Sequence, residues 1–375
     1  MVSRRALVRT ALGAAALGYN FADVGPFADA LARHFGVGLG AIGLITTALL
    51  ATHAAVQLPA ANPIARYGPD RVARAAFALL LVTNAAAASA HQLGVLEGVR
   101  ALMGVGTGVA FVACLEAARR DGGAVLAGVF GGVATFGVGL SLAVGAALAS
   151  HGGWRASFVI AALLALAAAV AIPAREPDAG RRLAARGDVR AVLGHRALWR
   201  LGLVHMMTFG CSLVLGAWIV SYLVRGGAHS HAVAALAGFA VLAIGGLVRP
   251  LGGVLLVRGA SWSVLVPAAA AATSLGLLAL ALSRSPLAVA LAVVLCGAGF
   301  ALPFSSIFIA AARAEPARAA AASAFVNLIG GVFALAVTPL VGADIDRSGG
   351  GRAFLALAAL AALAAFLNRR EPVAP

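Results

Sequence analysis

The stretch GVGTGVAFVACLEAARR at residues 104–120 returns, with changes, as GAGFALPFSSIFIAAAR at residues 297–313. An offset of 193 residues relates two glycines and the closing arginine of the two copies. A same-direction repeat at about half of the 375-residue length predicts two related halves with a pathway between them. The matched pairs are Gly104 and Gly297, Gly106 and Gly299, and Arg120 and Arg313.

The composition predicts that most of the chain lies in lipid. Hydrophobic residues make up 62% of it and charged residues only 11%, whereas soluble domains carry about a quarter of charged residues. Backbone groups in lipid must pair within their own segment, so apolar runs of about 20 residues predict membrane-spanning helices. The alternating pattern of an outer-membrane barrel is absent from the sequence. The predicted fold class is therefore an all-α membrane protein.

Polar breaks divide the chain into twelve predicted spans. They form an N-terminal six-helix bundle (1–173), a cytoplasmic linker (174–199) and a C-terminal six-helix bundle (200–375). The paired arginines near the N-terminus resemble a twin-arginine export signal, but apolar runs continue along the chain, so an uncleaved first span is expected. The predicted spans are 7–31, 41–64, 72–90, 94–117, 124–149, 156–173, 200–224, 232–257, 263–283, 286–311, 318–343 and 352–368.

The arginines predict the orientation. All basic residues counted in the net charge of +15 are arginines, and most lie on one side when both termini are placed in the cytoplasm. The charge then reflects topology, so no nucleic-acid partner is expected. A bacterial-type inner (plasma) membrane is predicted. The arginines on the outer side are Arg33, Arg155, Arg225, Arg284, Arg347 and Arg352.

Motifs of enzymes are missing from the sequence. It contains no phosphate-binding GxxxxGK[ST], no HExxH and no nucleophile elbow. The three cysteines fall in apolar runs and are interpreted as packing residues. We expect no enzyme activity, cofactor or metal, and no nucleotide-binding site.

Three segments of the first half resemble the major facilitator superfamily of secondary transporters. LEGVRALMGVGTG at 96–108 is similar to the family's span 4, and HGGWRASFVIAALLAL at 151–166 to the start of its span 6. NPIARYGPDRV at 62–72 resembles the loop between spans 2 and 3, where Arg66 matches but the acidic position is Ala65. That substitution departs from the family's charge relay at the cytoplasmic gate. The resemblance implies two pseudo-symmetric six-helix bundles and transport by alternating access.

The second half resembles one branch of that family. RPLGG at 249–253 is similar to span 8 of nitrate/nitrite-type porters, in which the arginine binds the anion, and FVNLIGG from Phe325 resembles the branch's Gly/Asn signature. The branch also carries an arginine on span 2, where this chain has Gln57. One arginine instead of two favours a larger or singly contacted carboxylate over nitrate.

Arg249 is the central candidate for substrate binding. It lies nine residues before Arg258, or roughly 14 Å along a helix, which places it near the bilayer midplane. A cation there is costly against lipid, so it should face a cavity or a partner. A guanidinium suits a carboxylate or nitrate, and a fixed structural partner is the alternative.

Four neutral side chains complete the predicted substrate site. Gln57 takes the place of Arg249 in the first half, and His53 lies one turn before it on the same face. His53 is interpreted either as a proton-sensitive partner or as a packed residue. Asn327 and Asn20 can hydrogen-bond cargo or join helices. His205 is interpreted as a packing residue.

Coupling or gating is assigned to charged residues. Asp23 is the only carboxylate far from any predicted span end, and Arg100 lies in the outer part of span 4. Asp23 is either a proton carrier or half of a fixed ion pair with Arg100, for which Glu97 competes as partner. Arg66 is assigned to the cytoplasmic gate.

The sequence thus predicts a secondary transporter of a small organic or inorganic anion, with the lipid bilayer, the substrate and protons as partners and a monomeric state. The alternative is a proton-coupled efflux pump for drugs or apolar metabolites. Efflux members of the family tend to carry a Gly-Pro pair in span 5, and the sequence TFGVGLSLAVGAAL here has no proline. A third class, a receptor or assembly factor that transports nothing, is possible on the same scaffold.

Overall fold

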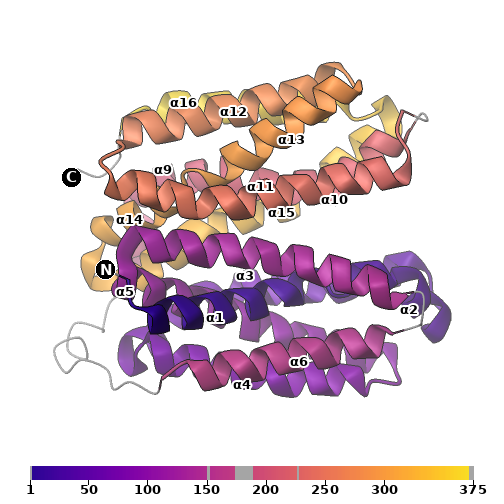
Figure 1. The fold of residues 1–375 in the computed structure, drawn as a ribbon, viewed down its shortest axis with the longest axis horizontal. Helices are drawn as coiled ribbons and strands as arrows, with labels where there is room; N and C mark the ends of the chain where they lie inside the picture. Colours follow the sequence, from indigo (N-terminus) through magenta and orange to yellow (C-terminus); the bar gives the residue numbers. More distant parts are fainter. Residues whose placement is uncertain (1, 150–152, 174–188, 226–227, 371–375) are drawn as a thin grey trace. The chain divides into compact units, whose positions relative to one another are not determined.

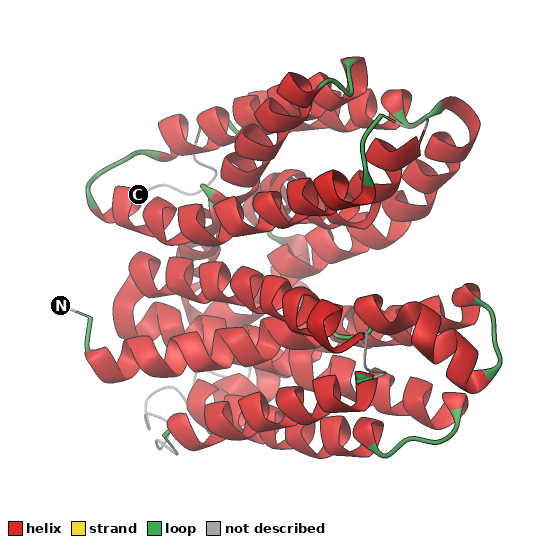
Figure 2. Cartoon of the chain, turned by 45° about the vertical axis from the view of Figure 1, so that its right-hand side comes forward, coloured by secondary structure: helices red, strands yellow, loops and turns green. Residues whose placement is uncertain are grey.

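A computed structural model describes residues 2–149, 153–173, 189–225 and 228–370. The chain forms two compact units, residues 1–189 with 317–324 and residues 190–316 with 325–375. Most of the predicted linker, 174–188, lies outside the described residues, and its boundaries stay a prediction. The described part consists of helices joined by loops (Figure 2), which confirms the all-α fold class.

The first unit contains one exceptionally long helical run, α5, which holds two predicted spans. The run is broken at Gly122 and Gly123. Gly123 has φ 56° and ψ −137°, a conformation that glycine adopts readily because it has no Cβ. Helix α5 packs along α1, α3 and α4 (Figure 1). The elements are α1 (Arg4–Ala22), η1 (Gly25–Phe27), α2 (Ala28–Phe35), α3 (Leu39–Tyr67), α4 (Pro69–Ala88), α5 (Leu93–Ala149) and α6 (Trp154–Ala171).

The second unit has interrupted helices at two of its spans. A π-helical turn separates α9 from α10, and Leu302–Pro303 separate α13 from α14. The elements are α8 (Val189–Gly194), α9 (Arg196–His205), η2 (Met206–Gly210), α10 (Cys211–Val224), α11 (His231–Val257), α12 (Trp262–Leu282), α13 (Pro286–Ala301), α14 (Phe304–Ala314), η4 (Pro316–Arg318), α15 (Ala319–Ser348) and α16 (Gly351–Leu367). Residues 317–324, at the end of η4 and the start of α15, belong to the first unit.

Lengths and hydropathies agree with a multi-pass membrane protein. Nine helical runs of the described residues are long and apolar enough to cross a membrane. One of the nine is α5, which contains two predicted spans, and α1 and the shorter α16, which are not among the nine, cover the first and last. The helices are therefore consistent with twelve spans.

Proline accounts for two differences from the predicted spans. The predicted span 7–31 was continuous, but α1 ends at Ala22 and a 3-10 turn containing Pro26 follows. The predicted span 286–311 is interrupted at Pro303. Proline cannot donate to the carbonyl four residues earlier and its ring clashes with that turn, so both helices stop close to it.

Packing at the glycines confirms the repeat. A Cβ on Gly106 of α5 would lie 2.9 Å from the Leu80 side chain of α4. A Cβ on Gly299 of α13 would lie 2.4 Å from Thr273 Oγ1 of α12. Both residues of the second contact are 193 positions after those of the first. The two units therefore bring equivalent helices together at equivalent small residues.

Candidate functional site

A fully buried ion pair joins α5 to the end of α1 in the first unit. Arg100 Nη1 donates to Asp23 Oδ1 at 2.9 Å and to Oδ2 at 3.1 Å, and both side chains are 0% exposed. Arg100 Nη2 donates to the Asn20 carbonyl at 3.3 Å. Charges buried this deeply persist only when they are paired and hydrogen-bonded. Asp23 is therefore the partner of Arg100.

Glu97 does not compete for that arginine. Its side chain is partly exposed and forms no ion pair within the described part of the chain. The guanidinium instead lies 5.9 Å from the centre of the Phe158 ring of α6. Of the two interpretations of Asp23, the ion pair with Arg100 is thus present, whereas a role for Glu97 in coupling stays a prediction.

Asn20 is engaged in joining helices. Asn84 Nδ2 on α4 donates to Asn20 Oδ1 at 2.8 Å, and Asn20 Nδ2 donates to the Ala16 carbonyl at 2.8 Å. Both amides are 0% exposed. Of the two interpretations of Asn20, these contacts favour the structural one.

His53 and Gln57 both lie on α3 with little exposure. Thr107 Oγ1 donates to the Gly104 carbonyl at 3.1 Å and lies 3.0 Å from His53 Nδ1. Since the hydroxyl proton is used in the first bond, the network assigns the second bond to His53 Nδ1–H as donor. Atom Nε2 is then the acceptor of the ring. The ring also meets the edge of Phe21 at 5.0 Å.

Arg249 lies on α11 in the second unit and is partly buried. Its guanidinium carbon is 4.8 Å from the centre of the Phe304 ring. Phe304 is the first residue of α14, directly after Pro303, so the break in this span places the ring. A guanidinium stacks on the face of an aromatic ring, and its N–H donors then point outward in the guanidinium plane, where they can form hydrogen bonds.

A polar and aromatic cluster lies beside that arginine. His205 Nε2 is 3.0 Å from Asn327 Oδ1 of α15, and the His205 ring stacks on Phe209 at 5.2 Å and meets Phe308 at 5.1 Å. The Phe304 ring that Arg249 contacts lies 6.4 Å from the His205 ring, centre to centre. The π-helical turn begins at the residue after His205, and such turns are frequent at functional sites.

His205 packs as predicted, since its ring is buried against Phe209 and Phe308. Its pairing with Asn327 was not predicted. The two partners are 122 residues apart, so no local pattern connects them. Arg249 and Asn327 thus come together within one unit. His53 and Gln57 belong to the other unit, and a site shared with them stays a prediction.

Four charged residues on α1, α4 and α5 form a network in the first unit. Arg120 Nη2 pairs with Asp70 Oδ2 at 2.8 Å, Arg120 Nε pairs with Asp121 Oδ1 at 3.0 Å, and Asp121 also pairs with Arg9. The assignment of the loop's acidic position to Ala65 missed Asp70, which supplies a buried carboxylate two residues after Gly68. Arg66 is exposed and instead lies 5.1 Å over the Tyr67 ring.

Within the described residues, no three His, Cys, Asp or Glu side chains come together as a metal site. No curated protein sequence matches the chain.

Solved structures that match the chain include three transporters. The E. coli fucose:proton symporter FucP has 19% identity and a TM-score of 0.78, with 99% of this chain and 100% of that chain covered. The proton:xylose symporter XylE has 14% identity and a TM-score of 0.76, with coverages of 97% and 94%. The human organic anion transporter MFSD10 (TETRAN) has 15% identity and a TM-score of 0.77, with coverages of 97% and 99%. At these identities the likeness shows the fold.

The sequence profile of one family matches residues 10–339, which is most of the chain. Its extent agrees with the duplicated helical units and with the solved structures of the same fold. The chain belongs to the Major Facilitator Superfamily of membrane transporters.

Proposed function

We propose that this protein moves a small organic anion across the membrane by alternating access, with Arg249 binding the anionic group. The observation that carries the proposal is the guanidinium of Arg249 lying 4.8 Å from the Phe304 ring, which is itself 6.4 Å from the ring of His205, the partner of Asn327. A flat cation of this kind suits a carboxylate. Helices α9 to α14 contain no Asp or Glu, so an entering anion meets no negative side chain on them.

The coupling ion in this proposal is the proton. Asp23 is a buried carboxylate on a spanning segment, where ionisable residues are costly and commonly functional. Two solved structures of the same fold are titled proton symporters, and a third is titled an organic anion transporter, which supports both parts of the proposal. We further propose cytoplasmic termini, from the distribution of arginines, and a monomeric state.

Arg249→Gln and Arg258→Gln form a matched pair for the test. Arg258 closes α11, is exposed, and lies nine residues from Arg249. Transport of a panel of small carboxylates would be measured in proteoliposomes. Arg249→Gln should raise the substrate concentration needed for half-maximal transport by about 10- to 100-fold, the range expected for a lost hydrogen bond to a charged group. Arg258→Gln should transport like the wild type.

Three results bear on the proposal. Arg249→Lys should recover part of the loss, because lysine restores the charge but not the planar fork. Equal transport by the wild type and folded Arg249→Gln would refute the anion site. Transport of neutral sugars or drugs, with no carboxylate transported, would favour the alternative substrates.

A further inference from the structure

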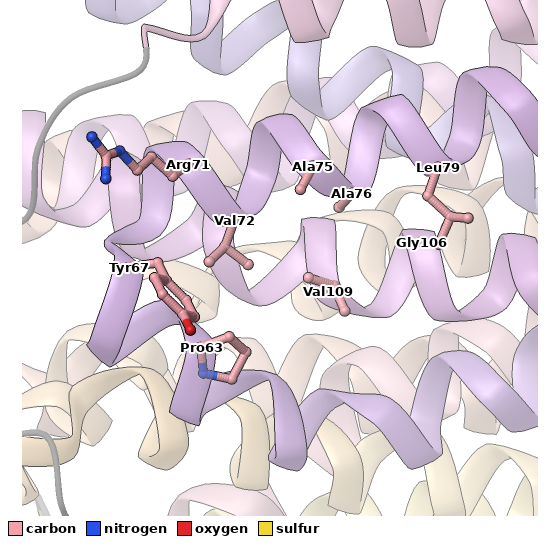
Figure 3. A pocket seen from close by; sticks show the side chains of 9 residues that line it. All are labelled: Pro63, Tyr67, Arg71, Val72, Ala75, Ala76, Leu79, Gly106 and Val109. Atoms are coloured by element: carbon pink, nitrogen blue, oxygen red, sulfur yellow. The ribbon is translucent and has the colours of Figure 1, made fainter.

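A groove on the first unit is unrelated to Arg249. It lies between α3, α4 and α5 and has a volume of about 470 Å³. Its walls are apolar along most of its length, with Val72, Leu79 and Val109 as the large side chains (Figure 3). Gly106 of α5 also lines the groove, at the end that Leu79 occupies.

Two polar side chains stand at the other end of the groove. Tyr67 is the last residue of α3 and Arg71 lies in the first turn of α4, on the two sides of Gly68, whose φ of 83° permits the sharp turn. Figure 3 shows both side chains near this turn and away from Leu79. Arg71 and Leu79 are two turns apart on one face of α4, about 12 Å along its axis.

These dimensions fit one leaflet of a membrane. Half of a hydrocarbon core of about 30 Å is about 15 Å, so a groove of about 12 Å runs through most of one leaflet. The turn that carries Tyr67 and Arg71 lies on the arginine-rich side of the chain, which is the cytoplasmic side under the orientation proposed above. A molecule in the groove would have an apolar chain in the bilayer and a polar end at the cytoplasmic surface.

We propose that the groove holds one acyl chain of an anionic phospholipid from the cytoplasmic leaflet, with its phosphate at Arg71. Charge complementarity selects this occupant, because the guanidinium adds a positive charge where the apolar lining ends, and anionic headgroups bind basic pockets between spanning helices. A peptide segment fits less well, since its backbone groups would face a lining with hydrogen-bonding side chains at one end only.

The test uses the full-length purified protein in mild detergent. Native mass spectrometry would count retained lipids during titration with phosphatidylglycerol or with phosphatidylcholine. We expect one phosphatidylglycerol to bind in preference to phosphatidylcholine. Arg71→Gln should weaken its binding about fivefold, the effect of one arginine near an anionic surface. Ala75→Phe, at an exposed groove position one turn after Arg71, should block binding by filling the space.

Arg74→Gln is the matched control, because Arg74 is an exposed arginine of the same helix outside the groove. Equal losses in Arg71→Gln and Arg74→Gln would overturn the proposal in favour of diffuse attraction. Unchanged phosphatidylglycerol binding by Ala75→Phe would overturn the groove as the site, and equal retention of phosphatidylcholine would overturn headgroup selection. Ala75→Leu provides the same comparison if the Phe variant does not fold.

Discussion

The Asp23–Arg100 pair provides the sharpest test of the energetics of this fold. Replacing Arg100 with Met removes the guanidinium and leaves Asp23 in a site that is 0% exposed. No water can reach the carboxylate there without opening the contact between α1 and α5. We therefore expect the single substitution to be strongly destabilising, although methionine fills much of the same volume.

The hydrogen bonds set the magnitude. Arg100 donates two bonds to the Asp23 carboxylate and one to the Asn20 carbonyl. Leaving one member of a buried pair uncompensated costs about 3–5 kcal/mol, whereas apolar replacement of both members is often close to neutral. The carbonyl of Asn20 still loses its donor in the double variant, at about 1 kcal/mol. We expect Arg100→Met to lose about 3–5 kcal/mol and Asp23→Leu/Arg100→Met about 1 kcal/mol.

The assay is unfolding of purified protein in mixed micelles, followed by circular dichroism, for the wild type, both single variants and the double variant. A double-mutant cycle isolates the interaction of the two side chains from their separate effects. Transport by the same four proteins in proteoliposomes separates stability from function. A double variant that folds yet cannot accumulate substrate would assign Asp23 to coupling, and one that transports normally would assign the pair to structure.

The reasoning is refuted if Arg100→Met alone is as stable as the wild type. That outcome would mean that the lone carboxylate is readily accommodated, and the cost assigned to its burial would be wrong. A double variant less stable than either single variant would contradict it as well, because apolar replacement would then fail where the structure allows it.

Two further predictions concern the packing of a glycine and the effect of burial on ion pairs. Gly104→Ala should destabilise the protein by about 1–3 kcal/mol in the same unfolding assay, because its Cβ would lie 2.2 Å from the Leu49 carbonyl oxygen. Gly43→Ala, whose Cβ would meet no neighbouring atom within 4 Å, should be neutral or stabilising. Asp70→Asn should cost about 1–3 kcal/mol, because it weakens a bond to Arg120 at a buried carboxylate. Asp346→Asn, in the exposed pair with Arg225, should cost at most about 1 kcal/mol; equal losses for the two Asp variants would contradict the role of burial.

The sequence predicted the helices well because lipid imposes a simple rule on the backbone. Apolar length alone located the runs that became α3, α4 and α11, and the two glycines at 122–123 lie in the predicted break between two spans. Because only apolar length was used, the first predicted span continued beyond Pro26, whereas α1 ends at Ala22. A hydropathy pattern does not register a backbone break when the residues around it are apolar.

The candidate site was predictable where charge made burial costly. Asp23 and Arg100 stood out because each is an ionisable residue inside an apolar run. Asp70 was missed because the loop was aligned on Arg66 and Gly68, which placed the expected acid at Ala65. The pairing of His205 with Asn327 was not predicted, because the two residues belong to distant segments that only the folded helices bring together. Pairings of this kind are properties of helix packing and have no local signature.

The duplicated units share their packing positions but differ in their polar positions. A Cβ added to Gly18 of α1 would clash with the Ala134 backbone of α5. A Cβ added to Gly210, 192 residues later, would crowd the Gly330 backbone and the Phe333 ring of α15. Close helix approach is thus retained in both units.

The ion pair has no such counterpart. The same offsets carry Asp23 to Leu215 and Arg100 to Val293, both buried in the apolar core of the second unit. If the pair served only to hold a bundle together, the second bundle, whose helices pack in the same way, would have the same use for it. Since a buried ion pair is costly in a membrane and the equivalent described positions of the second unit are apolar, we expect the pair to serve a task that the second unit does not share.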